Sequence, residues 1–201
     1  EVKSMTIRLF LDAGHNPGTI NAGAVVDGVY EEQVNYTVTQ LLADLLDTDC
    51  RFAVRTSRMY PQQVLGTNTS TSLNERVSMA NAWPADYFFS IHCNYNESSL
   101  INGSEIYVYQ NGSIAWEMAQ IILPALTQYA GTKDNLVRIN PSLYVLRKTT
   151  MPALLIELGY LTNEKDRQKL IEDPYAFAYG IYMGILYYFT HIDPQATRCR
   201  I

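Results

Sequence analysis

The sequence predicts one α/β domain, built on a twisted, mostly parallel β-sheet with helices on both faces. Segments of strand length alternate with segments of helical period along all 201 residues, and no internal repeat or linker separates them. Segment 86–94 is almost continuously apolar, which is typical of a strand covered on both faces. The length suits a single domain, so we expect one domain over residues 1–201, with an irregular tail after about residue 191.

The first half of the chain is expected to alternate strands with helices. Strands are expected at 5–11, 51–58 and 86–94, and helices at 31–47 and 73–82. The first helix has the clearest pattern, because its apolar residues recur at helical spacing. Its apolar stripe consists of Val34, Val38, Leu41, Leu42 and Leu45. Residues 61–72 are polar and show no period, so they predict a loop that is long for a compact domain.

The second half continues the same alternation. Strands are expected at 103–110 and 152–161, and helices at 113–130 and 174–189. Pro124 lies inside the first of these helices and predicts a kink or an end there. Asp173 followed by Pro174 is a typical helix start, with a capping side chain before a proline in the first turn.

Charge and hydropathy exclude two classes of partner. The formal net charge is −5, and no run of lysine or arginine is present, so we do not expect nucleic acid as a partner. No apolar run approaches the roughly 18 residues of a membrane span. The chain starts at Glu1 without a methionine or a signal sequence, which we take as a trimmed or mature form.

The three cysteines are Cys50, Cys93 and Cys199. They are far apart and show no C-x-x-C spacing, which favours neither a zinc knuckle nor a disulfide scaffold. A bridge between Cys50 and Cys199 is the less favoured alternative. Strand alternation turns Cys93 away from His92, so we expect Cys93 to be a small core residue.

Three chemically active side chains lie near predicted strand ends. His15 follows the first strand, His92 ends the third, and Glu157 lies near the end of the strand at 152–161. In sheets of this kind, functional groups gather beyond the carboxyl ends of the strands. Two imidazoles and a carboxylate around zinc, with a fourth position open, are a common catalytic arrangement. A lone histidine near a strand end is nevertheless more often structural than a ligand.

The carboxylate for such a site is expected from the helix at 31–47. Glu31 shares a face with the apolar stripe, so it should point inward, whereas Glu32 should point to solvent. The alternative is that Glu31 merely suits a first helical turn, where the helix dipole favours negative charge.

Glu157 follows four apolar residues in a predicted buried strand, where a carboxylate is costly unless it is paired, ligated or used. We expect it to act as a general base. The alternative is a buried ion pair, for example with Arg147. We interpret His191, near the end of the last helix, as a surface residue or a helix-end cation.

The chain resembles the zinc-dependent catalytic domain of N-acetylmuramoyl-L-alanine amidases, which are bacterial cell-wall hydrolases. The resemblance rests on motifs that occur in the expected order between residues 7 and 163: LDAGHNPG, EEQVNYTVTQLLADLL, RTSR with LNERVSMANAWPADYFFSIHCN, NGSEIYVY, and LYVLRKTTMPALLIELGYLTN. The terminal helix fits as well. The resemblance implies a twisted, mostly parallel sheet with helices on both faces, in agreement with the independent expectation above.

The resemblance also implies a site and a reaction. His15, Glu31 and His92 would bind one Zn²⁺ per chain, and Glu157 would be the catalytic glutamate. The substrate would be peptidoglycan, cut at the amide between N-acetylmuramic acid and the L-alanine of the stem peptide by zinc-activated water. Action outside the cytoplasm, by a secreted or wall-associated autolysin, follows from that substrate. A regulatory protein partner stays open.

Two departures from the family pattern are Asn16, where glycine is usual, and Cys93, where alanine is usual. Neither removes a catalytic group, and Asp12 is a candidate for orienting a neighbouring ligand. Two alternatives remain. One is a wall-binding or partner-regulated protein of the same fold with little activity, and the other is a zinc exopeptidase on a similar scaffold.

Overall fold

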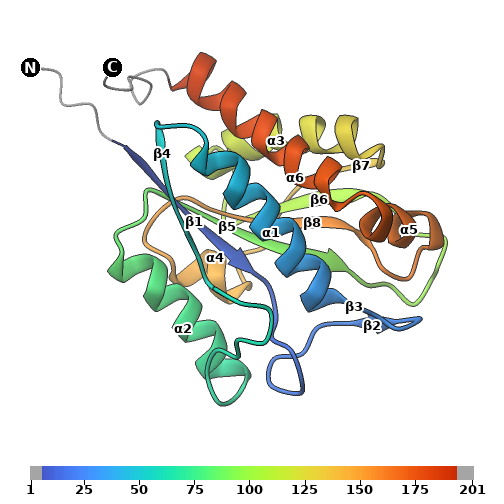
Figure 1. The fold of residues 1–201 in the computed structure, drawn as a ribbon. Helices are drawn as coiled ribbons and strands as arrows, with labels where there is room; N and C mark the ends of the chain where they lie inside the picture. Colours follow the sequence, from blue (N-terminus) through green and yellow to red (C-terminus); the bar gives the residue numbers. More distant parts are fainter. Residues whose placement is uncertain (1–5, 194–201) are drawn as a thin grey trace, which may run out of the picture.

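The computed structural model describes residues 6–193 and shows a six-stranded main sheet between helices (Figure 1). The strands are β1 (Ile7–Ala13), β2 (Val25–Val26), β3 (Val29–Tyr30), β4 (Phe52–Thr56), β5 (Tyr87–Asn94), β6 (Ser104–Val108), β7 (Asp134–Ile139) and β8 (Ala153–Tyr160). The helices are α1 (Glu31–Asp47), α2 (Thr69–Ala82), α3 (Ile114–Ala130), α4 (Tyr144–Lys148), α5 (Glu164–Glu172) and α6 (Pro174–Tyr187), followed by a π-helical turn η1 (Tyr188–Ile192). The predicted α/β class is confirmed.

The main sheet has six strands in the order β4-β1-β5-β8-β6-β7. All neighbouring pairs are parallel except β6 and β8, which are antiparallel. A small antiparallel hairpin of β2 and β3 leads into α1. Since β6 and β7 run opposite to the other four strands, their amino ends lie where the others have their carboxyl ends.

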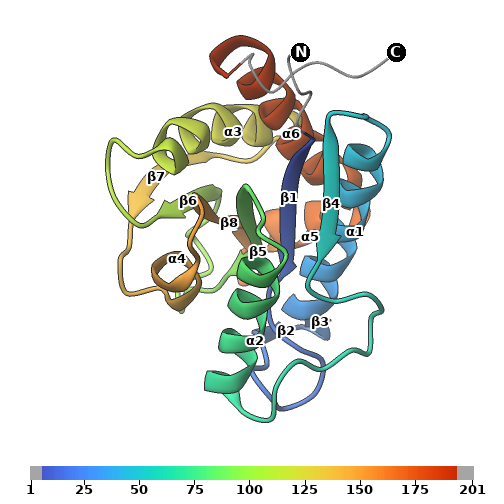
Figure 2. The same cartoon turned by 90° about the vertical axis from the view of Figure 1, so that its left-hand side faces the viewer.

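Helices cover both faces of the sheet, as predicted (Figures 1 and 2). On one face, α1, α3 and α6 enclose the larger core with strand residues such as Leu9, Leu11 and Phe89. On the other face, α2 and α4 enclose a smaller core around Phe10 and Phe88. Alternation along β1 therefore sends Leu11 to the larger core and Asp12 to the face of α2 and α4.

Helix α6 packs closely against α3 because of a glycine at their contact. A Cβ added at Gly180 would lie 2.7 Å from Cα of Leu126. Only a residue without a side chain allows the two backbones to approach this closely. Helix α3 continues through Pro124 to Ala130, so Pro124 does not end the helix, which was one of the two predicted outcomes. The packing of the apolar face of α3 in the larger core outweighs the loss of the backbone hydrogen bond that Pro124 cannot donate.

Helix α2 begins earlier than expected, within the segment predicted to be a loop. Asn68 caps it by accepting a hydrogen bond from the backbone N–H of Thr71, and the Thr71 side chain accepts one from the backbone N–H of Asn68. This reciprocal cap starts the helix at Thr69 instead of residue 73. The hairpin β2–β3, strand β7 and helices α4 and α5 were not predicted either. Strand β7 is a half-exposed edge strand, so its sequence has little apolar pattern.

Cys50 is disulfide-bonded, so the sequence spacing was wrong to make a bridge at this residue the less favoured alternative. Cys199 lies outside the described residues. Cys93 is a buried free thiol in the larger core, as predicted. Between residues 6 and 193, no helix is both long and apolar enough to span a membrane.

Candidate active site

Three side chains from separate parts of the chain meet at one end of the sheet. His15 lies two residues after β1, His92 lies near the end of β5, and Glu31 is the first residue of α1. Their ligand-capable atoms all lie within 4.8 Å of one another. Strands β1 and β5 are parallel neighbours, so their carboxyl ends bring the two histidines together. These are the three residues expected from the sequence to bind a metal, and the structure brings them into one cluster.

Glu31 joins the two histidines. Its Oε1 atom lies 3.3 Å from Nε2 of His15 and 3.2 Å from Nδ1 of His92. Backbone N–H groups of Cys93 and Ala24 donate to its two oxygens and fix the carboxylate in place. Burial alone would raise the pKa of Glu31, but the hydrogen bonds and charges of the histidines hold its pKa well below the ordinary value.

The ring of His15 is oriented by a backbone carbonyl. Its Nδ1 atom lies 3.0 Å from the carbonyl oxygen of Asn21. A carbonyl can only accept, so Nδ1 carries a proton, and Nε2 is the ring nitrogen that faces Glu31. His15 also has a φ of 65°, an uncommon conformation for a residue with a side chain. Such a conformation persists only where the surroundings enforce it.

Gly14 makes room for the ring of His92. A Cβ at position 14 would lie between 2.3 and 2.7 Å from three atoms of that ring. The two histidine rings meet edge to face, with 4.8 Å between their centroids. The glycine before His15 is therefore a requirement of the site.

A buried arginine, Arg76 of α2, supports the loop that carries His15. Its guanidinium donates to Oδ1 of Asp12 at 2.5 Å, to the carbonyl oxygens of Ala13 and His15 at 2.5 Å each, and to Oδ1 of Asn16 at 2.8 Å. Asp12 does not touch a histidine; it binds Arg76 and the hydroxyl of Ser90.

The Arg76 network also gives a reason for Asn16. Its amide nitrogen donates to the carbonyl oxygen of Leu65, while its oxygen accepts from Arg76. Arg76 was not among the predicted site residues, although the sequence contains a signal for it. Arg76 is next to Val77 and four residues before Ala80, both core residues, so helical spacing places it on the inner face of α2.

The expectation that Glu32 points to solvent is wrong. Glu32 is buried, and its carboxylate pairs with the guanidinium of Arg58 at 3.4 Å. Arg58 also donates to the carbonyl oxygens of Glu32 and Pro61. The hydrophobic period of a single helix cannot show that an arginine from another segment of the chain pairs with one of its carboxylates.

Glu157 lies on β8 directly beside His92 of β5, in the same row across the sheet. Its Oε2 atom is buried and has no hydrogen-bond partner within residues 6–193. Burial and then the negative charges of Glu31 and Glu105 raise the pKa of Glu157 well above its ordinary value. Arg147 does not pair with it; that side chain donates to the carbonyl oxygen of Ser142.

A small hollow of about 140 Å³ opens beside the two histidines. Leu73 of α2 and Tyr144 and Val145 of α4 form part of its wall. Helix α4 was not predicted, and it is only five residues long. His191, interpreted as a surface residue, is exposed in η1.

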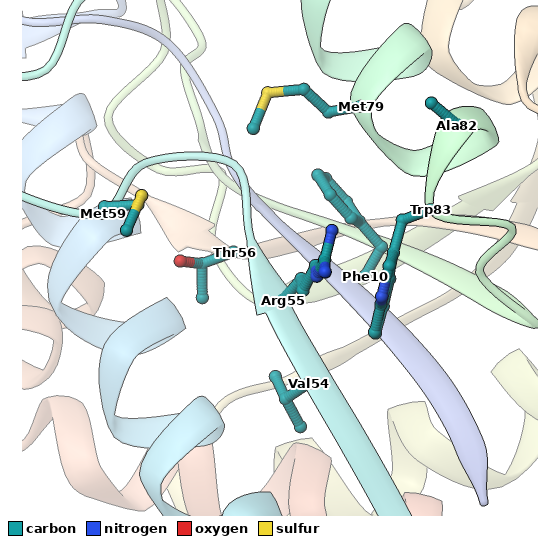
Figure 3. Close-up of a pocket in the computed structure, with 8 residues that line it drawn as sticks. All are labelled: Phe10, Val54, Arg55, Thr56, Met59, Met79, Ala82 and Trp83. Atoms are coloured by element: carbon teal, nitrogen blue, oxygen red, sulfur yellow. The ribbon is translucent and has the colours of Figure 1, made fainter.

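A separate hollow of about 610 Å³ lies between β4 and α2 (Figure 3). Its lining contains no histidine and no carboxylate, and the guanidinium of Arg55 lies over the ring of Trp83. Metal or acid–base chemistry is therefore placed at the histidine cluster and not in this hollow.

The donor set at the cluster fits a divalent metal. Two imidazoles and one ionised carboxylate converge, one imidazole is oriented by a carbonyl, and a partly buried acid lies alongside. This combination suits Zn²⁺ with an open coordination position, although imidazole and carboxylate do not by themselves exclude other divalent metals.

Known proteins share both the sequence pattern and the fold. Residues 9–187 match the N-acetylmuramoyl-L-alanine amidase family. The N-acetylmuramoyl-L-alanine amidase LytC of Bacillus subtilis (strain 168) is 33% identical over 186 residues, a match that covers 90% of this chain. The chain spans 35% of the length of that relative.

Two solved structures are similar over nearly the whole chain. The catalytic domain of CwlV, an N-acetylmuramoyl-L-alanine amidase from Bacillus (Paenibacillus) polymyxa var. colistinus, is 30% identical with a TM-score of 0.80, covering 92% of this chain and 98% of that one. The CwlD amidase from Clostridioides difficile, in complex with the GerS lipoprotein, is 26% identical with a TM-score of 0.80 and the same coverage.

Proposed function

Since this chain belongs to the N-acetylmuramoyl-L-alanine amidase family, we propose that it hydrolyses peptidoglycan at the amide between N-acetylmuramic acid and the L-alanine of the stem peptide. The observation that carries the proposal is the cluster of His15, Glu31 and His92 beside a glutamate, Glu157, with an unpartnered buried oxygen. A metal-supported hydrolysis needs both parts: a set of ligands and an adjacent group that can move a proton.

In this proposal, His15, Glu31 and His92 hold one Zn²⁺. Bound there, zinc would lower the pKa of a water molecule to about 7 and polarise the scissile carbonyl. The carbonyl of Asn21 supports this role, because it holds the proton of His15 on Nδ1 and leaves Nε2 available. Backbone N–H groups of Ala24 and Cys93 donate to Glu31 and hold its carboxylate in position.

Glu157 is proposed as the general base and then the general acid. It removes a proton from the attacking water and delivers that proton to the leaving amide nitrogen, which departs as an amine. Its raised pKa suits this double role, because a carboxyl group whose pKa is raised above the ordinary value binds a proton more readily and can then return it.

Incubation of the zinc-loaded protein with purified sacculi, followed by mass spectrometry of the soluble products, tests the function. We expect intact stem peptides with a free L-alanine amino terminus. Chelation should abolish their release, and added Zn²⁺ should restore it. Free amino acids would indicate the exopeptidase instead, and binding to sacculi without products would indicate a wall-binding protein.

The matched pair His92→Ala and His191→Ala tests the ligand set. His92→Ala should lose bound zinc, measured by elemental analysis after gel filtration, together with hydrolysis. His191→Ala should retain both, because His191 is exposed and outside the cluster. Equal zinc content in the two variants would contradict the proposed ligands.

Gly14→Ala is expected to weaken zinc binding by about 10- to 100-fold, the range typical of changes that disturb the support of a ligand. The added methyl group would overlap the His92 ring, so the ring must move. Competition with a chromogenic chelator measures the affinity, and circular dichroism checks the fold. Unchanged affinity in a folded variant would show that the ring of His92 is not fixed by this contact.

The proposal includes the place of action and a partner. A peptidoglycan substrate lies outside the cytoplasm, so we infer that the protein acts there. The similarity to CwlD, whose structure is that of a complex with the GerS lipoprotein, supports a regulatory protein partner as part of the proposal.

A further inference from the structure

A hollow of about 430 Å³ lies on the far side of Glu157 from the metal cluster. It is formed by β6, by the start and middle of β7, by the end of β8 and by the loop that precedes β6. The lining residues that matter here are Glu105, Tyr107, Lys133, Arg138 and Tyr160. None of them belongs to the proposed catalytic machinery.

Glu105 organises one side of this hollow. It is 2% exposed, and its Oε1 accepts hydrogen bonds from Asn94 Nδ2 at 2.6 Å, from the Tyr107 hydroxyl at 3.0 Å and from the Tyr160 hydroxyl at 3.2 Å. Its Oε2 pairs with Nε of Arg138 at 2.7 Å. A buried carboxylate with this many partners fixes the side chains around it, so the hollow is a rigid, preformed one.

The hollow carries positive charge that is not paired with a carboxylate within the described residues. Arg138 contacts Glu105 through Nε, and its terminal nitrogens make no hydrogen bond to residues 6–193. Lys133 is exposed, and its ammonium group has no carboxylate partner in the same range. Since Glu105 balances one cation, the hollow has a net charge of about +1 in a chain whose net charge is −5.

The position of the hollow relative to Glu157 follows from strand register. His92, Glu157 and Glu105 are paired across β5, β8 and β6 and form one row. Strand β7 lies next to β6, and Tyr107 is paired with Arg138. Adjacent strands are about 4.8 Å apart, and Tyr107 lies two residues of about 3.3 Å each along β6 from Glu105, so Arg138 lies roughly 12 Å from Glu157, in the direction away from the histidines.

We propose that this hollow binds the leaving peptide and that Lys133 and Arg138 recognise a carboxylate on its second residue. The inference rests on the proposed function. The proton must pass from Glu157 to the leaving nitrogen, so the peptide begins at Glu157, while the carbonyl stays at the histidine cluster. An extended peptide spans at most about 3.6 Å per residue, so its second residue reaches about 7 Å past the nitrogen. The long side chains of Lys133 and Arg138 cover the remaining distance.

The hollow is expected to distinguish leaving peptides by the charge of their second residue. A free α-carboxylate on the second residue, as in D-isoglutamate, would accept charged hydrogen bonds from both cations, whereas the corresponding amide, as in D-isoglutamine, would leave the positive charge unpaired. The glycan arm would then lie on the other side, at the hollow lined by α2 and α4.

The test uses two muramyl peptides that differ only in this carboxylate or amide. The wild-type zinc protein should have a KM about tenfold lower for the acid, because a hydrogen bond to a charged group contributes at least this factor. Lys133→Ala should raise the KM of the acid toward that of the amide, because one of the two cations is removed, and should leave kcat unchanged. Arg138→Gln should act in the same direction. Lys148→Ala, which removes an exposed lysine outside both hollows, should keep the preference.

Equal KM values for acid and amide in the wild-type protein, or an equal rise for both in Lys133→Ala, would overturn the inference while hydrolysis itself still supports the proposed function. Calorimetry of the binding of the free dipeptide L-alanyl-D-isoglutamate further separates a failure of this inference from a failure of the proposed function. Binding that is lost in Lys133→Ala would support the hollow even if the protein hydrolysed neither substrate. Binding unaffected by Lys133→Ala would contradict it even in an active enzyme.

Discussion

Replacing Glu157 by glutamine is expected to lower kcat by about 10²- to 10⁴-fold, the usual contribution of a general acid–base group. The amide keeps the shape of the side chain but can neither remove a proton from water nor return one to the leaving nitrogen. Zinc binding should be retained, because Glu157 is not one of the three clustered ligands. The loss should therefore appear in kcat at full zinc occupancy.

The stability of the Glu157→Gln variant gives an independent check on the environment of this residue. A carboxyl group whose folded pKa is raised stabilises the fold below its unfolded pKa and loses that contribution as the pH rises through the folded pKa. In the metal-free protein, the unfolding free energy of the wild type should therefore fall with rising pH relative to that of the variant, because only the wild type carries this titrating carboxyl group. Urea titrations between about pH 4 and pH 9 measure this difference.

Glu164→Gln is the matched control, since Glu164 is an exposed residue of α5. It should change neither kcat nor the pH dependence. A Glu157→Gln protein that binds zinc and retains full activity would eliminate the proposed proton transfer. A protein that loses its zinc would instead place Glu157 among the metal ligands.

Replacing Arg76 by methionine is expected to lower the free energy of unfolding by about 3–5 kcal/mol, the usual cost of removing one partner of a buried ion pair. Asp12 would be left ionised and buried, and the carbonyl oxygens of Ala13 and His15 would lose their donor. Burial alone would raise the pKa of Asp12, but Arg76 and nearby hydroxyls outweigh it and lower that pKa. This contribution is present above the unfolded pKa of about 3.9 and is lost as pH falls through the folded pKa, so the measurement belongs near pH 7.

Denaturant unfolding of the metal-free protein measures this loss. Arg8→Met is the control, because the pair between Arg8 and Asp86 is about 40% exposed on each side and should contribute far less. The double variant Asp12→Leu with Arg76→Met should be more stable than Arg76→Met alone, since it removes the unpaired charge. A single variant as stable as the wild type would mean that water reaches Asp12 and replaces the guanidinium.

The sequence predicted those features that depend on the local period of the chain. The helix at 31–47 coincides with α1, because its apolar stripe is regular and packs on the sheet. Glu31 was placed correctly since helical spacing alone turns it inward. His15 and His92 could be placed together because parallel strands end at one edge of a sheet.

The features that escaped prediction depend on contacts between distant segments. Glu32 is buried only because Arg58 reaches it from the loop after β4. Arg76 is buried only because Asp12 and two carbonyls surround it, whereas an arginine in a helix is usually exposed. Strand β7 lies at the edge of the sheet and exposes residues such as Leu136, so neither its composition nor its alternation distinguishes it from a loop.

The reversed direction of β6 and β7 has a consequence for how such a protein can diversify. At the edge of the sheet where the site lies, four strands have their carboxyl ends. Strands β6 and β7 have their amino ends there, so the segments that precede them, near 94–103 and 131–133, lie at this edge. The connection from β6 to α3 leaves from the opposite end of the sheet. Insertions near residue 110 should thus leave substrate choice intact, while changes at the other two segments would alter which peptides are accepted.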